Sequence, residues 1–438
     1  MTDQLSVIVA GLSVIALKRL KRLLRVWGLE ENEDYGEEKM DVMMVTARAP
    51  VNIAIIKYWG KRNEDLVLPL NDSLSVTLSK EQMYAETTVA VSASFSRDRM
   101  WLNGKEQDME NPRLQNCLRE IRRRARKRKT YDDDDSKDDH HLNFHVHICS
   151  CNNFPTAAGL ASSAAGYACL VYALGKLFKV EADLSEIARQ GSGSACRSIY
   201  GGFVQWIKGT EEDGSDSIAR QIASNDHWPE LRILVLVVND QKKHTSSTQG
   251  MGSSVITSDL LKYRAAHIVP HRIKEITNAI VEKNFQKFAE ITMKDSNQFH
   301  AICMDTYPPL RYVNATSLAI MDLVHSYNAF YGVNKIAYTF DAGPNACLFM
   351  LEQNVSDVAA LIKHFFPTNV GNSKFFIGLP VTPLEHLSET LINSMQISPI
   401  HRGLQYVIHT QVGTGPELIE ISSAHLLDDA GIPKQSTS

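Results

Sequence analysis

Apolar runs, some alternating with polar residues and some unbroken, predict the strands of this chain. Residues 51–58 are apolar and branched, residues 74–78 alternate, and residues 231–238 form a continuous apolar run. A continuous run of this length is typical of a strand that is buried on both faces. Asn103 and Gly104 form a turn signal. The same patterns predict further strands at residues 86–95, 143–149, 338–340 and 346–351.

Apolar positions three and four residues apart predict helices between these strands. Residues 112–129 place Pro112 in the first turn, and Leu114, Leu118 and Ile121 then share one face. A long apolar helix is expected at residues 164–178. Further helices are expected at residues 183–189, 258–264, 271–282, 285–297 and 316–327.

This mixture of helices and strands indicates an α+β chain. A length of 438 residues allows two or three domains, each with its own core. We expect an N-terminal extension at residues 1–44, an N-terminal domain at 45–230 that contains the phosphate loop, and a C-terminal domain at 231–438 that carries Asp341.

The extension has an unusual order of apolar and basic residues. Its apolar run at residues 5–17 is shorter than the roughly 20 residues that a membrane-spanning helix needs. Basic residues follow this run, whereas in a secretory signal they precede it. A basic amphipathic helix at a membrane surface is one interpretation. We favour a poorly ordered extension that ends in the acidic stretch 30–38.

Charge and cysteine content exclude several classes of function. The net charge of −4 gives no general basic surface for nucleic acid. The basic run at residues 122–129 is followed by aspartates at 132–135 and 138–139, so we interpret these runs as a solvated loop. Seven cysteines, without CxxC spacing, argue against a disulfide framework or zinc site and favour the cytosol.

Four histidines lie within eight residues: His140, His141, His145 and His147. No carboxylate or cysteine at a suitable spacing completes a metal site. We therefore expect His145 and His147 to lie on the outer face of the strand at residues 143–149.

A loop of small residues at 155–163 (PTAAGLASS) leads directly into the apolar helix. Small residues let the backbone approach a ligand, and a helix start offers unpaired N–H groups to an anion. A serine cap on a tightly packed helix would give the same pattern, and no GxxxxGK[ST] loop is present. The candidate ATP-phosphate residues are Ala157, Ala158, Gly159, Leu160, Ala161, Ser162 and Ser163, the last with a possible Mg²⁺ contact.

Two further segments combine small or hydroxyl residues with positive charge. Residues 191–198 (GSGSACRS) contain Arg197, whose planar fork suits a carboxylate or phosphate. A flexible turn with a surface arginine is the alternative. Residues 241–251 form a hydroxyl-rich segment with adjacent lysines, which could equally be a solvated loop.

Two short motifs complete the candidate chemistry. Lys57 and Lys61 lie four residues apart beside aromatic residues, directly after a branched strand. Asp341 begins an Asp-Ala-Gly-Pro-Asn turn between two apolar segments. An aspartate in this position is often structural, because its side chain accepts backbone N–H bonds.

In order and wording, these segments resemble the mevalonate diphosphate decarboxylases, a family in the superfamily of galactokinase, homoserine kinase, mevalonate kinase and phosphomevalonate kinase. The resemblance extends from about residue 45 to 433 and leaves out the extension and the insert at 122–139. It implies a two-domain fold with the active site in a deep cleft between the domains. Asp72 departs from the serine common in the family. The matching pieces are residues 49–54, 57–62, 71–78, 153–168, 191–203, 293–300 and 338–346.

The resemblance also implies roles for individual residues. Asp341 would be the catalytic aspartate at the substrate 3-hydroxyl, Lys57 the lysine that assists there, and Arg197 the residue that holds the substrate carboxylate. Ser163 would lie near the ATP phosphates, and Arg113 would contact the diphosphate. The implied substrate-binding residues are Tyr58, Trp59, Gly60, Lys61, Arg113, Ser192, Gly193, Ser194, Ala195, Cys196, Arg197 and Ser247.

The reaction implied is ATP-dependent, Mg²⁺-assisted conversion of (R)-5-diphosphomevalonate to isopentenyl diphosphate, ADP, phosphate and CO₂, in the route to isoprenoids and sterols. The resemblance also implies a homodimer. A relative that phosphorylates without decarboxylating is the nearest alternative, and Arg197 argues against it. A catalytically inactive binding protein is a second alternative, and the presence of Asp341, Lys57 and Arg197 together argues against that. An RNA-binding role for residues 122–129 is a third.

Overall fold

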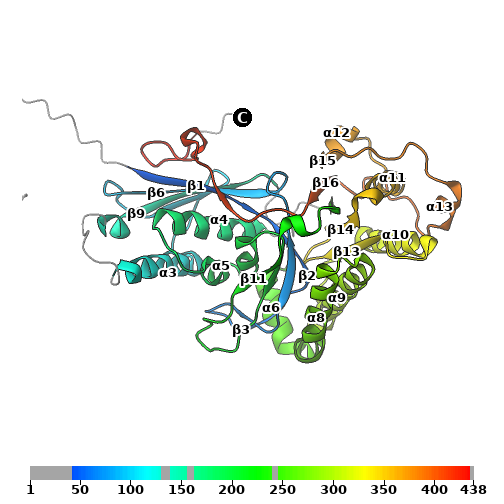
Figure 1. Ribbon diagram of the computed structural model, residues 1–438, viewed down its shortest axis with the longest axis horizontal. Helices are drawn as coiled ribbons and strands as arrows, with labels where there is room; N and C mark the ends of the chain where they lie inside the picture. The colour runs from blue at the N-terminus through cyan, green and yellow to red at the C-terminus, as the bar shows by residue number, and fades with distance from the viewer. Residues whose placement is uncertain (1–41, 130–138, 155–161, 239–244, 435–438) are drawn as a thin grey trace, which may run out of the picture. The chain divides into compact units, whose positions relative to one another are not determined.

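Three larger sheets and one two-stranded sheet organise the computed structural model, which describes residues 42–129, 139–154, 162–238 and 245–434 (Figure 1). Their strand orders are β17-β1-β6-β9-β7-β8, β11-β10-β5-β2, β13-β14-β12-β16-β15 and β3-β4. The strands are β1 (Met43–Pro50), β2 (Asn52–Ile56), β3 (Lys61–Asn63), β4 (Leu68–Pro69), β5 (Ser73–Thr77), β6 (Tyr84–Ser92), β7 (Arg99–Leu102), β8 (Lys105–Gln107), β9 (His145–Asn152), β10 (Phe203–Trp206), β11 (Ala219–Ala223), β12 (Leu231–Val237), β13 (Ile336–Phe340), β14 (Ala346–Leu351), β15 (Phe376–Gly378), β16 (Tyr406–Gln411) and β17 (Glu417–Leu418).

In the N-terminal part, the six-stranded sheet is covered on one side by α-helices (Figure 1). Helix α4 (Ser162–Leu177) packs against β1 and β6, and its small apolar residues let it lie close to the sheet. It is apolar on most sides, as expected for a helix enclosed between a sheet and other helices. The helices of this part are α3 (Pro112–Lys129), α4 (Ser162–Leu177) and α5 (Leu184–Gly191), followed by the 3₁₀-helix η3 (Gly193–Ile199).

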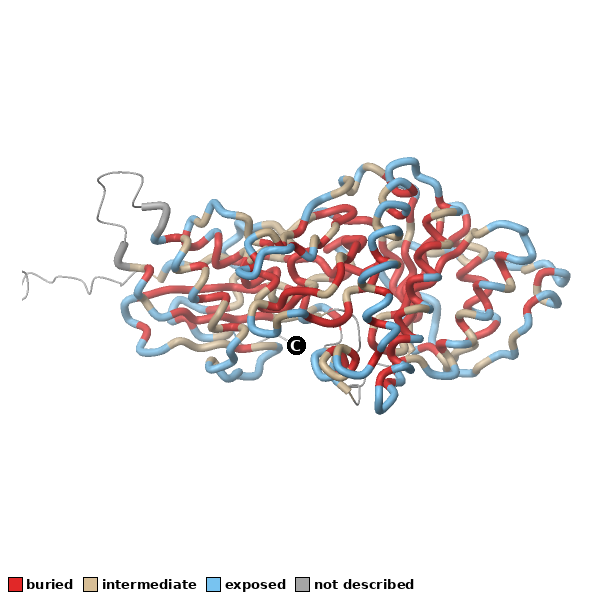
Figure 2. The backbone as a smooth tube through the Cα atoms, turned by 90° about the horizontal axis from the view of Figure 1, so that it is seen from below, coloured by how far each residue is buried: buried red, intermediate tan, exposed pale blue. Residues whose placement is uncertain are grey.

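In the C-terminal part, β12 lies in the middle of the five-stranded sheet, between β14 and β16. All of its residues except Arg232 are buried, which confirms the prediction from its continuous apolar run. Figure 2 shows the buried residues, in red, gathered in the interior of the described fold. The strands predicted at residues 338–340 and 346–351 are confirmed as the antiparallel pair β13 and β14, the first of which begins two residues earlier, at Ile336. The helices of this part are α6 (Ser247–Thr257), α7 (Asp259–Tyr263), the π-helix η5 (Arg264–Ile268), α8 (Val269–Val281), α9 (Phe285–Asp305), α10 (Ala315–Tyr331), α11 (Val355–Phe365), α12 (Asn372–Phe375) and α13 (Glu389–Ser394).

The last segment of the chain returns to the first strand. β17 pairs with β1 at Ala47 and Arg48, and the Ile419 N–H donates to the Thr46 carbonyl. Farther along, His425 hydrogen-bonds the Thr46 hydroxyl, and the Leu426 N–H donates to Thr88. The six-stranded sheet therefore takes its outermost strand on this side from the C-terminal end of the chain.

This return corrects the expectation for His147, which was placed on the outer face of its strand. His147 is only 5% exposed, because the C-terminal segment covers that face of β9. Its Nδ1 hydrogen-bonds the Gly431 carbonyl, and its ring stacks on Phe95 with centroids 3.7 Å apart. Burial lowers the pKa of His147, so the neutral ring is favoured. His145 is exposed, as expected.

Two other expectations about loops were wrong. Residues 247–251 belong to α6, because the Ser246 side chain caps that helix by accepting from the Gln249 N–H. The basic run at 122–129 is no solvated loop but the last part of α3, which confirms the helix predicted at 112–129; Arg122 donates to the Phe144 carbonyl and Arg124 pairs with Glu120 and Glu186. Residues 132–135 and 138 of the acidic run lie outside the described residues, as do residues 241–244 and residues 1–41 of the expected extension. No helix in the described ranges is long and apolar enough to cross a membrane.

Candidate active site

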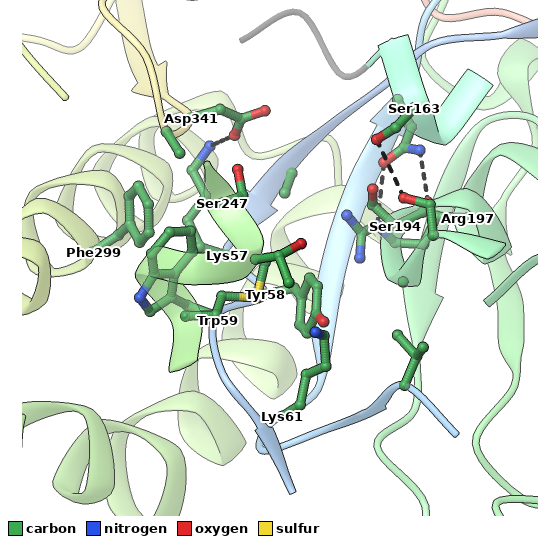
Figure 3. Close-up of a pocket in the computed structure, with 18 of the residues that line it drawn as sticks. Lys57, Tyr58, Trp59, Lys61, Ser163, Ser194, Arg197, Ser247, Phe299 and Asp341 are labelled. Carbon is green, nitrogen blue, oxygen red and sulfur yellow. Dashed lines mark hydrogen bonds and ion pairs between the residues drawn. The ribbon is translucent and has the colours of Figure 1, made fainter. Parts of the chain in front are cut away.

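A cavity of about 470 Å³ collects most of the residues that the sequence singled out (Figure 3). Its walls come from both parts of the chain, with the end of β2, the start of α4 and η3 on one side, and α6, α9 and the β13–β14 turn on the other. The predicted residues among its lining are Lys57, Tyr58, Trp59, Lys61, Arg113, Ser162, Ser163, Ser192, Gly193, Ser194, Arg197, Ser247 and Asp341.

An ion pair between Lys57 and Asp341 lies at one end of this cavity. The Lys57 Nζ is 2.6 Å from Asp341 Oδ1, and the two side chains are 3% and 29% exposed. Each residue directly follows a buried strand, β2 or β13. The turn at Asp341 is closed by its own carbonyl, which accepts from the Gly343 N–H. The Asp341 carboxylate therefore pairs with Lys57 and lines the cavity. The backbone carbonyl of Asp341, and not its side chain, closes the turn.

Arg197 lies across the cavity from this pair (Figure 3). It is 2% exposed, which excludes the alternative of a surface arginine. Its Nη1 donates to Ser73 Oγ at 2.6 Å and its Nε to Asn52 Oδ1 at 3.2 Å, both neutral acceptors. Burial lowers the pKa of Arg197, although Asp341 is among the groups that act against this shift. Among the described residues no carboxylate lies within ion-pair distance of Arg197, so the cavity holds a buried cation that an anionic ligand could pair.

Aromatic residues, among them Tyr58, Trp59 and Phe299, line part of the cavity (Figure 3). The Tyr58 ring lies 4.6 Å from that of Trp206, and its buried hydroxyl has no hydrogen-bond partner among the described groups. Burial raises the pKa of Tyr58, so this hydroxyl stays a neutral donor. A Cβ at Gly193 would approach Tyr58 and Trp206 to 2.9 Å, which explains the glycine. Trp59 is held by its Nε1 bond to Ser254.

A second cavity, of about 300 Å³, adjoins the start of α4. It shares Ser162 and Ser163 with the first cavity, and its other lining residues come from β7, the segment from the end of β8 to the start of α3, the end of β9, and the face of α4 that carries Tyr167 and Leu170. The helix start thus lies where the two cavities meet. Ala157, Ala158, Gly159, Leu160 and Ala161, which the sequence also assigned to the phosphate loop, lie outside the described residues.

Among the predicted residues that the structure describes, three do not line either cavity. Gly60 has a φ of 86°, a left-handed conformation that a side chain disfavours, so its requirement is conformational. Ala195 and Cys196 are fully buried, and the Cys196 thiol donates to the Gly193 carbonyl. Sequence reasoning missed several lining residues, among them Asn52, Thr248 and Phe299. Asn52 could have been found, since it is a polar residue within an apolar strand.

His300 of α9 lies close to the charges of Lys57 and Asp341 and makes the fold sensitive to acid. It is 8% exposed, its Nε2 has no partner among the described groups, and burial together with the charge of Lys57 lowers its pKa from 6.5 to about 4. The unfolded chain therefore binds the extra proton between pH 6.5 and pH 4, and stability falls as the pH drops through this range. Going from pH 7 to pH 5 should lower the free energy of unfolding by about 2 kcal/mol through this group alone.

The variant His300→Gln should lose this part of the pH dependence. Denaturant titrations of both proteins at pH 7 and pH 5 measure how much the free energy of unfolding changes with pH. Both proteins contain the other buried histidines, so the difference between them reports on His300 alone. An equal loss of stability in both proteins would contradict the assignment to His300.

Comparisons with known proteins match both parts of this chain to one family. Residues 49–219 match a family model described as the diphosphomevalonate decarboxylase-like N-terminal domain, and residues 233–419 match the mevalonate 5-diphosphate decarboxylase C-terminal domain. A diphosphomevalonate decarboxylase from Danio rerio is 57% identical over 90% of this chain and 98% of its own length.

Solved structures agree with the sequence comparisons. Mevalonate diphosphate decarboxylase from Trypanosoma brucei superimposes with a TM-score of 0.78 at 38% identity, over 88% of this chain and all of the other. A structure of MDDEF in complex with MVAPP, AMPPCP and magnesium superimposes with a TM-score of 0.67 at 32% identity, over 87% of this chain and all of the other.

Proposed function

The chain belongs to the mevalonate 5-diphosphate decarboxylase family, and from this premise we propose that Lys57, Arg197 and Asp341 form its reaction centre. The protein catalyses the ATP-dependent decarboxylation of mevalonate diphosphate to isopentenyl diphosphate, with ATP and Mg²⁺ as the nucleotide substrate and metal. The roles of individual residues and the placement of each ligand in the cavities are the content of the proposal.

The chemistry needs a leaving group and a controlled loss of CO₂. A tertiary hydroxyl leaves poorly, so ATP converts it to a phosphate ester before elimination. The Asp341 carboxylate positions the 3-hydroxyl for this transfer and accepts its proton. The Lys57 ammonium, 2.6 Å from Asp341 Oδ1, stabilises negative charge that develops there.

Arg197 carries the proposal, because it is a buried cation at the cavity wall with only neutral partners among the described residues. A planar guanidinium can hold a carboxylate through two parallel hydrogen bonds. Holding the substrate carboxylate in this way aligns its C–C bond with the departing C–O bond, which is an orientation effect on the rate. Phosphorylation of a bare alcohol would not need such a cation.

The start of α4 supports a place for the nucleotide phosphates. Ser162 and Ser163 stand at the first turn of a 16-residue helix whose N-terminus favours anions. Magnesium bound with ATP supplies positive charge to the transferring phosphoryl oxygens. The hydroxyl of Ser163 is the group we propose to contact that ion through ATP. The adjoining cavity beside Tyr167 then takes the base and sugar of the nucleotide.

Four wider assignments are part of the same proposal. The domain boundary near residues 228–231 is supported by the gap between the two matched family models. The cleft between the two domains is supported by the mixed origin of the cavity walls. A cytosolic location fits the seven free thiols, and a homodimer, which sedimentation would test, rests on family membership.

A coupled assay tests the reaction directly. With ATP, Mg²⁺ and 5-diphosphomevalonate, ADP and CO₂ should form in equal amounts. ADP without CO₂ would indicate a kinase that stops after phosphorylation, and neither product would indicate an inactive relative. Both results would contradict the proposal.

A further inference from the structure

The backbone of Lys57 is held by a buried ion cluster in the C-terminal part of the chain. The Lys57 N–H donates to Asp295 Oδ2 at 2.8 Å, and Arg264 Nη2 donates to the Lys57 carbonyl at 3.2 Å. Lys57 lies just beyond the last residue pair of β2 with β5, which is Ile56 with Leu74. The cluster therefore takes over the backbone hydrogen bonds where the strand pairing stops.

The members of this cluster come from three consecutive helical elements. Asp295 belongs to α9, Arg264 opens the π-helix η5, and Arg272 lies in α8. Asp295 and Arg264 are 0% exposed, and Arg272 is 17% exposed. Burial alone would raise the pKa of Asp295, but Arg264 and Arg272 bring it below its ordinary value. The Asp295 carboxylate is therefore ionised, and both of its oxygens accept hydrogen bonds.

The two arginines use Asp295 differently. Arg264 contacts both carboxylate oxygens, at 2.7 and 2.9 Å, whereas Arg272 contacts only Oδ1, at 2.8 Å. Both also donate to Gln298 Oε1. Only Arg264 extends to Lys57 in the structure. A buried ion pair is weak evidence for stability by itself, whereas this one fixes the backbone of a residue in the proposed reaction centre.

We infer that Arg264 and Asp295 are positioning residues that fix the Lys57 ammonium against Asp341. This inference rests on the proposed role of Lys57. Neither residue lines the cavity, so both act through Lys57. Their loss should lower kcat and leave the KM values for ATP and diphosphomevalonate unchanged.

The variants Arg264→Lys and Arg272→Lys form a matched pair. Each keeps a positive charge beside Asp295, but a lysine at 264 cannot bridge Asp295 and the Lys57 carbonyl at once. We expect Arg264→Lys to lower kcat roughly tenfold to a hundredfold, because misplacement of a reacting group by about 1 Å has an effect of this size. Arg272→Lys should keep the kcat of the wild type. Thermal unfolding of both variants checks that they are folded.

Equal kcat values in the two variants would overturn the inference, as would a rise in KM at constant kcat for Arg264→Lys. If Arg264→Lys does not fold, Asn71→Ser replaces it, since Asn71 Nδ2 also donates to the Lys57 carbonyl, at 3.1 Å. That variant should show the same loss of kcat, and an unchanged kcat would overturn the inference.

Lys57→Met separates this inference from the proposed function. A fully active Lys57→Met protein would overturn the role of Lys57 itself. If Lys57→Met is impaired but Arg264→Lys and Arg272→Lys have equal kcat values, only the positioning role is overturned. Adding Arg264→Lys to Lys57→Met should bring no further loss of residual kcat, whereas a purely structural effect would add in full.

Discussion

Replacing Asp341 with asparagine is expected to lower kcat by roughly a hundredfold to ten-thousandfold, the usual contribution of a positioned acid or base. Asparagine keeps the shape of the side chain but removes the negative charge that lies 2.6 Å from Lys57. The substrate hydroxyl then loses both its proton acceptor and its oriented partner. Binding of the ATP analogue AMPPCP and of diphosphomevalonate should stay close to that of the wild type, since Asp341 supplies only one wall of the cavity.

Asp305→Asn is a suitable control for this variant. Asp305 ends α9 and accepts hydrogen bonds from Ser258 and Leu260, away from the cavity lining. It should keep full kcat even if its stability falls. Initial rates and calorimetric binding measure both variants, and a near-normal kcat in Asp341→Asn would remove the basis for its catalytic role.

Replacing Arg197 with alanine should lower kcat/KM by about a hundredfold, which corresponds to about 3 kcal/mol of lost transition-state stabilisation. The substrate carboxylate would enter a buried region without its counter-charge and without a group that fixes its orientation. Because orientation matters more as the C–C bond begins to break, kcat should fall together with the affinity. Single-turnover measurements of ADP and CO₂ separate the two steps.

Arg189→Ala is the matched control for Arg197→Ala. Arg189 is also a fully buried arginine with neutral partners, the carbonyls of Leu66 and Gly214, but it does not line the cavity. Its removal should cost stability and leave kcat/KM intact at temperatures where the variant is folded. A similar fall in kcat/KM in both variants would show that Arg197 acts through packing, contrary to the proposal.

Local patterns in the sequence predicted much of the framework. The continuous apolar run at β12, the helix at α3 and the antiparallel pair around Asp341 each follow from spacing within a few residues. The Asn103 and Gly104 turn also follows from local chemistry, since both residues adopt positive φ angles that suit asparagine and glycine. Helix α6 was missed because its serines and glycines are poor helix formers.

Contacts between distant residues could not be predicted from such patterns. Lys57 and Asp341 are 284 positions apart in the sequence, so no local pattern around either residue predicts that they form an ion pair. His147 was expected at the surface because its strand alternates, and only the returning C-terminal segment buries it. The family resemblance supplied the roles of Lys57 and Asp341, but it carried no information on the cluster of Arg264, Asp295 and Arg272.

The pairing of β17 with β1 has a consequence for the synthesis of this protein. The first strand of the described fold leaves the ribosome before the strand that covers its edge, because β17 lies C-terminal to the other described strands. Until then, β1 presents unpaired N–H and C=O groups, which can recruit strands from other chains. The nascent protein must therefore keep an open sheet edge while the chain between β1 and β17 is translated, and shielding by chaperones would be most useful in that interval.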